Sequence, residues 1–285
     1  MKVGMIKTLV AGLLATTALT SVALAGGSLK DAPAPAGRQL SWSFNIGGTS
    51  DYVFRGVSQN AEDPALQGGV DLTYGIFYAG IWSSMVGFGL FDGNPGSTDV
   101  VTAEVDFYAG IKPVWGPLTF DLGVIYYAYP GAKDGGAPSI WNEQDYVELK
   151  AGVSGSPVKN LTLGATVFFS PDYINETGQT WTIEGTAGYE FSKIGPFVPT
   201  LSSTLGTTLF ENAANATLFN AALGDDSYLY WNVGMALAVD KLALDFRYWD
   251  NDISGTATSC ANPGGGPGAS SCDQRFVFSA KITLP

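Results

Sequence analysis

Apolar and polar residues alternate along most of this chain from residue 40 onward. The alternation is strictest over residues 101–112, where six apolar side chains occupy one face and mostly polar residues the other. A period of two is typical of a β-strand with one apolar face, whereas a helix would mix the two sets. The same pattern predicts twelve strands, at residues 40–54, 66–74, 76–88, 101–112, 118–128, 146–153, 161–170, 181–191, 197–210, 229–239, 242–249 and 276–284.

The connections between these strands alternate in length. Long, Gly- and Asn-rich loops are separated by short turns at residue 75 and at residues 113–116, 156–160, 192–196 and 240–241. Antiparallel membrane barrels place short turns at one end and long loops at the other. We therefore predict an all-β fold, a transmembrane antiparallel up-and-down β-barrel of about 12 strands, within a range of about 10 to 14. Residues 40–285 would form this single domain.

The pentapeptide FYAGI occurs twice, at residues 77–81 and 107–111. The first copy follows a short turn and the second precedes one, so both should lie at the same end of the barrel on neighbouring strands. The spacing does not continue, which argues against a repeat architecture. In each copy Phe, Ala and Ile would face lipid, while Tyr and Gly would face the interior.

The N-terminus carries an export signal. Lys2 and Lys7 accompany an apolar stretch that ends in a small-residue motif at residues 23–25. Residues 1–25 are therefore predicted to be a secretory signal peptide, and residues 26–39, rich in Pro, Ala and Gly, a flexible N-terminal segment. Beyond this segment no apolar run is long enough for a spanning helix, but a closed barrel can still enter a bilayer. These features predict export through the periplasm to the outer membrane of a Gram-negative bacterium.

Composition removes several classes of function. Without the signal peptide, 12 basic and 26 acidic residues give a net charge of −14, which disfavours nucleic acid as a partner. The chain has no His, so Ser-His-Asp and Cys-His catalysis and His-ligated metals are excluded. No metal or cofactor is expected, and no glycine motif for nucleotide binding opens a helix. In an exported protein, Cys260 and Cys272 are predicted to form a disulfide.

Residues 50–84 resemble a known family. The shared positions are Ser50, Asp51, Tyr52, Arg55, Gly56 and Ser58, then PALQGG at 64–69 with Asp71, FYAG at 77–80 and Trp82, and SPDY at 170–173. Through them the chain resembles the TorF-like family of outer-membrane porin-like proteins. That resemblance implies a barrel in the outer membrane and brings no established substrate.

Most charged residues fall on the face opposite to the apolar one. Because a charge facing hydrocarbon at the bilayer midplane costs about 2–4 kcal/mol, these side chains should point into the barrel. They would line a lumen with selectivity for cations, or alternatively pair with each other, as Arg55 with Asp51 or Arg247 with Asp245, and fill a sealed interior. The predicted lumen residues are Asp51, Arg55, Asp71, Glu104, Asp106, Asp121, Glu148, Lys150, Glu184, Asp245 and Arg247. Inward glycines would either leave lumen volume free or allow close packing.

These features predict a porin-like channel for passive diffusion of small hydrophilic solutes, mildly cation-preferring through a net acidic lumen. The alternative is a non-conducting outer-membrane barrel that serves surface interaction or membrane integrity. No catalytic constellation is present, so the protein is not expected to be an enzyme. Outer-membrane lipid, lipopolysaccharide and small solutes or ions are the expected partners, and the sequence leaves the oligomeric state open.

Overall fold

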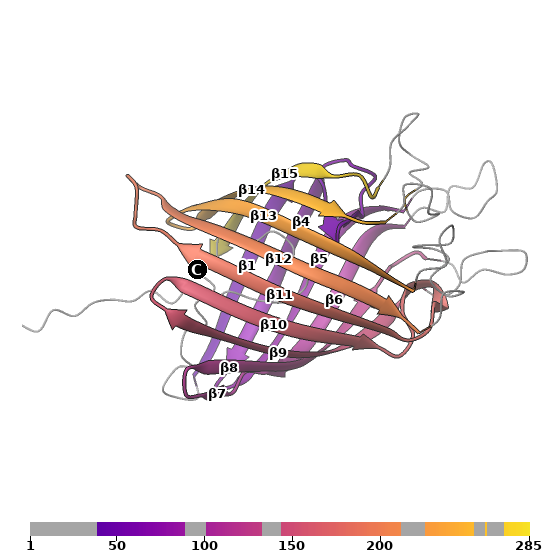
Figure 1. Cartoon of the computed structure of the whole chain (residues 1–285), viewed down its shortest axis with the longest axis horizontal. Coiled ribbons are helices and arrows are strands. Elements are labelled where there is room, and N and C mark those ends of the chain that lie inside the picture. Colours follow the sequence, from indigo (N-terminus) through magenta and orange to yellow (C-terminus); the bar gives the residue numbers. More distant parts are fainter. Residues whose placement is uncertain (1–38, 89–100, 133–143, 212–225, 254–259, 261–270) are drawn as a thin grey trace, which may run out of the picture.

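A computed structural model describes residues 39–88, 101–132, 144–211, 226–253, 260 and 271–285. The predicted signal peptide and nearly all of the predicted N-terminal segment lie outside these residues. One antiparallel sheet of 13 strands dominates the fold, and the pairing of β6 with β8 closes it into a barrel (Figure 1). Within the described ranges β7 pairs only with β8, at a turn, so 12 strands form the ring. The predicted fold class and strand number are confirmed.

Each predicted strand has a counterpart in the barrel. The ring consists of β1 (Leu40–Thr49), β4 (Ala65–Tyr74), β5 (Phe77–Phe88), β6 (Val101–Ile111), β8 (Leu118–Ala128), β9 (Tyr146–Val158), β10 (Leu161–Ser170), β11 (Thr180–Glu190), β12 (Val198–Phe210), β13 (Ser227–Val239), β14 (Leu242–Asn251) and β15 (Arg275–Leu284). Outside the ring order lie β2 (Val53–Phe54), β3 (Val57–Ser58), the turn strand β7 (Val114–Trp115) and a short 3-10 helix, η1 (Ile174–Glu176). No helix in the described residues is long and apolar enough to cross a membrane.

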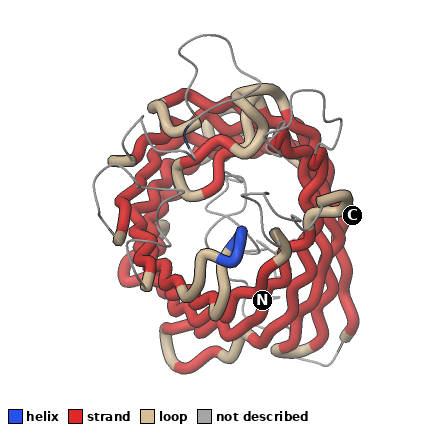
Figure 2. The backbone as a smooth tube through the Cα atoms, turned by 90° about the vertical axis from the view of Figure 1, so that its right-hand side faces the viewer, coloured by secondary structure: helices blue, strands red, loops and turns tan. Residues whose placement is uncertain are grey.

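Short and long connections lie at opposite ends of the barrel, as the sequence predicts. Turns as short as Asp240 and Lys241 join strands at one end, called here the short-turn end, and both β1 and β15 have their terminal residues there. Every connection at the opposite, long-loop end is longer, and η1 belongs to one of them. Figure 2 looks along the barrel and shows the ring of strands with η1 inside its outline.

Side chains alternate between an apolar outer face and a polar inner face. Along β11, Trp181, Ile183 and Tyr189 are exposed on the outside, whereas Thr182 and Glu184 are buried on the inside. The other ring strands repeat this arrangement, so the large exposed residues of the barrel wall are almost all apolar. A soluble protein rarely exposes so large an apolar surface, whereas lipid covers it in a membrane barrel. Along the ring strands, the polar side chains therefore lie mostly inside the ring, and the exposed apolar side chains lie outside it.

The two FYAGI copies pair with each other across β5 and β6. Tyr78 is the register partner of Gly110, and Gly80 is the partner of Tyr108. A Cβ atom at Gly80 would meet the Tyr108 ring, and one at Gly110 would meet the Tyr78 ring. Each tyrosine therefore lies over the glycine of the other copy, which accounts for the shared Tyr and Gly of the two copies.

Candidate functional site: the barrel interior

All eleven predicted lumen residues lie inside the barrel. Nine project inward from the ring strands: Asp71, Glu104, Asp106, Asp121, Glu148, Lys150, Glu184, Asp245 and Arg247. Asp51 was wrongly predicted to lie on the first strand, because β1 ends at Thr49 and not at residue 54. Asp51 and Arg55 belong instead to a connection that folds back into the ring.

This connection, residues 50–64 between β1 and β4, is called here the plug. It contains the hairpin of β2 and β3, and Gln59 donates a backbone hydrogen bond to the carbonyl of Tyr52 across it. Tyr52, Val53, Phe54 and Val57 of the plug are all buried, although no outer layer covers the barrel. The plug therefore lies inside the ring at the long-loop end. Its apolar side chains pack against inward aromatic residues such as Tyr127, which contacts Phe54 edge to face.

A buried ion pair joins the plug to the barrel wall. The Arg55 guanidinium donates two hydrogen bonds to Glu148, at 2.7 and 2.9 Å, and the two side chains are 2% and 1% exposed. The Phe54 and Phe168 rings stack over the same guanidinium. The predicted pairing of Arg55 with Asp51 was therefore wrong. The other suggested pair is confirmed, since the Arg247 Nε lies 3.1 Å from Asp245.

Tyrosine hydroxyls satisfy most of the inward carboxylates. Glu104 accepts hydrogen bonds from Tyr52 of the plug and from Tyr129, at 2.6 and 2.7 Å. The remaining pairs are Tyr127 with Glu148, Tyr78 with Asp121, Tyr108 with Asp71 and Tyr230 with Glu184. Lys150 also pairs with Asp121, at 2.5 Å. The interior is thus a network in which most charges are partnered, as the second of the two alternatives from the sequence describes.

Asp106 differs from the other acids. It is fully buried, and neither of its carboxylate oxygens has a hydrogen-bond partner among the described residues. Glu104 lies two residues away on the same face of β6, and Trp82 and Tyr127 are the register partners of Asp106 on the adjacent strands. No group of three or more His, Cys, Asp or Glu residues in the described part of the chain is arranged to hold a metal ion.

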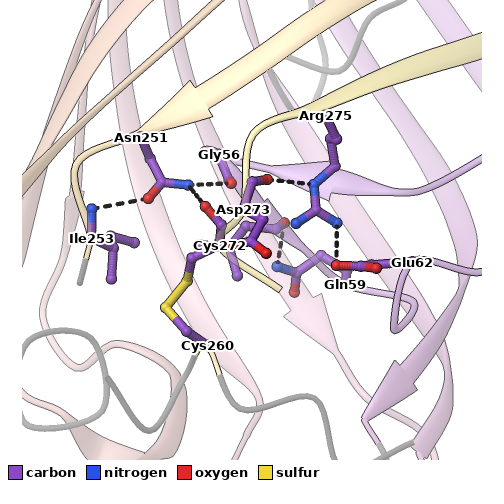
Figure 3. Close-up of a disulfide and its surroundings, with 10 residues drawn as sticks. Gly56, Gln59, Glu62, Asn251, Ile253, Cys260, Cys272, Asp273 and Arg275 are labelled. Carbon is purple, nitrogen blue, oxygen red and sulfur yellow. Dashed lines mark hydrogen bonds and ion pairs between the residues drawn. A yellow bond between two sulfur atoms is a disulfide. The ribbon is translucent and has the colours of Figure 1, made fainter. Parts of the chain in front are cut away.

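A second set of contacts holds the plug from the side of β14 and β15. The predicted disulfide is confirmed, with Cys260 and Cys272 joined at a Cα separation of 5.1 Å. Beside it, the Asn251 amide donates to the carbonyl of Cys272 and to that of Gly56 in the plug, at 2.9 and 2.8 Å (Figure 3). Gly56 has a φ of +85°, and a Cβ there would approach Tyr230 and Asn251. The plug turn therefore requires glycine.

The base of the plug is held by charge. Arg275 donates to Asp51 at 2.8 Å and also contacts Glu62 at 3.5 Å. Burial raises the pKa of Asp51 above its usual range, although the Ser58 hydroxyl and Arg275 oppose the shift. Burial likewise raises the pKa of Tyr173, beside η1, to about 12, against the nearby charge of Arg55. Both groups lie in connections outside the spanning strands.

The inward glycines serve packing at several positions. A Cβ at Gly206 would overlap the Tyr230 ring, and one at Gly123 would overlap the Tyr78 hydroxyl. The aromatic rings that bind the acids thus lie flat over glycines of neighbouring strands. Of the two explanations that the sequence allowed, close packing is confirmed at these positions. The sequence analysis did not identify the tyrosines as hydrogen-bond donors to the interior carboxylates. They occupy inward positions of the alternating pattern, as the Asp and Glu residues do, and this could have indicated their role.

Comparisons with known proteins place the chain in a family and among barrels. A family model described as "Bacterial protein of unknown function (Gcw_chp)" matches residues 33–283. No curated protein matches the chain. The TorF-like name is not part of this match, so that resemblance stays a prediction.

Several solved barrels are similar in structure. The "KdgM porin" is 8% identical, with 85% of this chain and 99% of that chain covered at a TM-score of 0.48. "LpxR from Salmonella typhimurium" is 10% identical, and the "NanC porin" is 8% identical; both have TM-scores of 0.45 and the same coverage as the first. At TM-scores below 0.5 these likenesses carry no argument about function.

Proposed function

This chain belongs to the Gcw_chp family of bacterial proteins, whose description states no function. We therefore propose a function from the structure of the barrel. The protein acts as an outer-membrane porin-like channel for small hydrophilic solutes, and the plug closes the channel in the conformation seen here. The observation that carries this proposal is a charged interior inside an apolar wall. A barrel that served only as an anchor would need neither eleven inward charges nor a separate segment to fill its lumen.

The balance of charge supports a mild preference for cations. The eleven predicted lumen residues comprise eight acids and three bases, and adding Lys112, Arg275 and Lys281 still leaves the acids in excess. A low-dielectric wall lined by one sign of charge concentrates ions of the opposite sign. Catalysis is not part of the proposal, and the expected partners remain membrane lipid and small solutes.

One observation favours the alternative of a non-conducting barrel. The contacts of Arg55 and Tyr52 with the wall are fully buried, and buried ion pairs are costly to break. If the plug never leaves, the barrel would serve surface interaction or membrane integrity. The two functions differ in whether a current passes when the plug is displaced.

Bilayer recordings under a salt gradient test the selectivity that we propose. Channel openings of the wild-type protein should be rare. The reversal potential of their current should be shifted from zero toward the equilibrium potential of the cation. The double substitution Glu104→Gln with Asp106→Asn should move that potential toward zero, because it removes two acids from the part of the lumen beside the plug. A matched double substitution at the outer rim, Glu62→Gln with Asp63→Asn, should leave it unchanged. An anion-selective wild type would contradict the proposal.

A further inference from the structure

The disulfide between Cys260 and Cys272 is buried together with the plug. The two cysteines are 1% and 5% exposed, and they belong to the same buried cluster as the apolar side chains of the plug. The connection that carries them joins β14 to β15, and the structure describes its residues 252, 253, 260 and 271–274. A covalent bond at this position can act on the plug as well as on its own connection.

Ser271 links the disulfide to the hairpin of the plug through its backbone. Its amide donates a hydrogen bond to the carbonyl of Cys260 at 3.0 Å, and its own carbonyl accepts one from the amide of Ser58 in β3 at 2.8 Å. Ser271 therefore stands between Cys260 and the plug. Because Cys272 is the next residue, the disulfide holds both sides of this backbone contact together.

Asn251 makes a second link at the same place. Its side-chain nitrogen donates to the carbonyls of Cys272 and Gly56, and its side-chain oxygen accepts from the amide of Ile253 at 2.9 Å (Figure 3). The side chain is thus fixed between the disulfide and the glycine turn of the plug. The position of that turn depends on where Cys272 is held.

Breaking the disulfide should loosen both links. The bond joins residues with a sequence separation of 12, and its loss returns the conformational freedom that closing this loop removes. The backbone of Ser271 would then be tied to Cys260 by a neutral hydrogen bond, whose net contribution is small. The contacts of Arg55 and Tyr52 with the wall would remain, so the plug would lose its support on the side of β14 and β15.

From these observations we propose that the disulfide is a redox latch, which retains the plug in the lumen while the bond is intact and releases it when the bond is reduced. This inference rests on the proposed channel function, because it names a regulation of that function. The reductant is a dithiol. It donates two electrons and two protons and becomes a disulfide itself, while the bond between Cys260 and Cys272 breaks to give two thiols.

The burial of the bond adds a consequence. Since the closed plug shares the buried cluster with both cysteines, a reductant in solution reaches the sulfur atoms when the plug has moved. Reduction would therefore occur on the open state and would prolong it. The latch would respond slowly to the reductant and would keep the channel open until the thiols are oxidised again.

Single-channel recordings of the purified full chain before and after treatment with dithiothreitol test the latch. Thiol titration confirms reduction, at two thiols per chain. The open probability should rise about tenfold or more, because two hydrogen-bonded links to the plug are weakened. The double variant Cys260→Ser with Cys272→Ser should match the reduced protein and should not respond to dithiothreitol. Asp273→Asn changes an exposed side chain of the same connection and should leave the open probability unchanged.

Asn251→Ala tests the second link while the disulfide stays intact. It removes the side-chain contacts with Cys272 and Gly56, and the open probability should rise about threefold or more. If the bond resists reduction and the double serine variant does not fold, this variant decides the question, since unchanged openings would overturn the proposal. An equal response of the double serine variant to dithiothreitol would also overturn it.

Hydrogen exchange of the Ser58 amide in detergent micelles gives a readout that needs no current. Its exchange should become about tenfold faster when the disulfide is reduced, because its partner is the carbonyl of Ser271. An unchanged exchange rate would refute the latch. Faster exchange in a barrel that stays silent even without residues 50–64 would refute only the channel function. A barrel that conducts without residues 50–64, but stays silent when reduced, would refute only the latch.

Discussion

Replacing the plug, residues 50–64, by the dipeptide Asn-Gly should convert the closed barrel into a steadily conducting one. The replacement is geometrically simple because Thr49 and Ala65 are register partners at the ends of β1 and β4. An Asn-Gly turn joins two paired strand ends directly in a two-residue hairpin. The ring would therefore be retained, while the segment that packs inside it at the long-loop end would be absent.

The expected effect is large because the plug supplies much of the buried cluster at the long-loop end, with Tyr52, Val53, Phe54 and Val57 all in it. Planar bilayers should show frequent, steady openings for the shortened barrel and rare ones for the wild type. Glu62→Gln is the control, since Glu62 is partly exposed at the base of the plug and the variant keeps the buried contacts. If the shortened barrel folds and remains as silent as the wild type, residues 50–64 do not close a channel.

Replacing Arg55 with Met should cost about 3–5 kcal/mol of barrel stability, because it leaves the Glu148 carboxylate buried without its cation. Glu148 is 1% exposed, and of the contacts described here only the Tyr127 hydroxyl, at 3.0 Å, would remain. Met fills a similar volume, so the loss should come from charge and not from a cavity. Equilibrium unfolding in urea with lipid vesicles measures the difference.

The double variant Arg55→Met with Glu148→Met separates the pair from its surroundings. Since both charges are then absent, most of the lost stability should return. Arg55→Lys should fall between the wild type and Arg55→Met, because it keeps the charge but loses the two-pronged contact. A variant Arg55→Met as stable as the wild type would show that the pair does not anchor the plug.

The ring of strands could be predicted from the sequence because membrane barrels impose a simple rule on each strand. Outward positions contact lipid and inward positions do not, so a period of two persists over the whole span. The ends of β8 and β10 agree with the predicted ranges to the residue. Pro199 did not prevent β12 from forming near its predicted start.

The plug could not be predicted because its residues continue the same alternation after the strand has ended. In the sequence, Tyr52 and Phe54 continue the alternating pattern of β1, yet the chain leaves the wall at Ser50 and enters the lumen. Nothing local marks this change, since the partners that hold the plug, such as Glu148 and Asn251, lie far away in the sequence. The pairing of charges depends on this same long-range geometry, which explains why Arg55 was assigned to Asp51.

The central claim, that every second residue of the ring faces lipid, is tested most directly by spin labels along β11. Residues 183–187 are replaced in turn by Cys in otherwise native protein, whose own two cysteines are joined in the disulfide. In liposomes, labels at Ile183, Gly185 and Ala187 should be readily accessible to oxygen dissolved in the lipid. Labels at Glu184 and Thr186 should be far less so. Loss of this alternation, or greater access of a water-soluble nickel chelate at Ile183 and Gly185, would contradict the account.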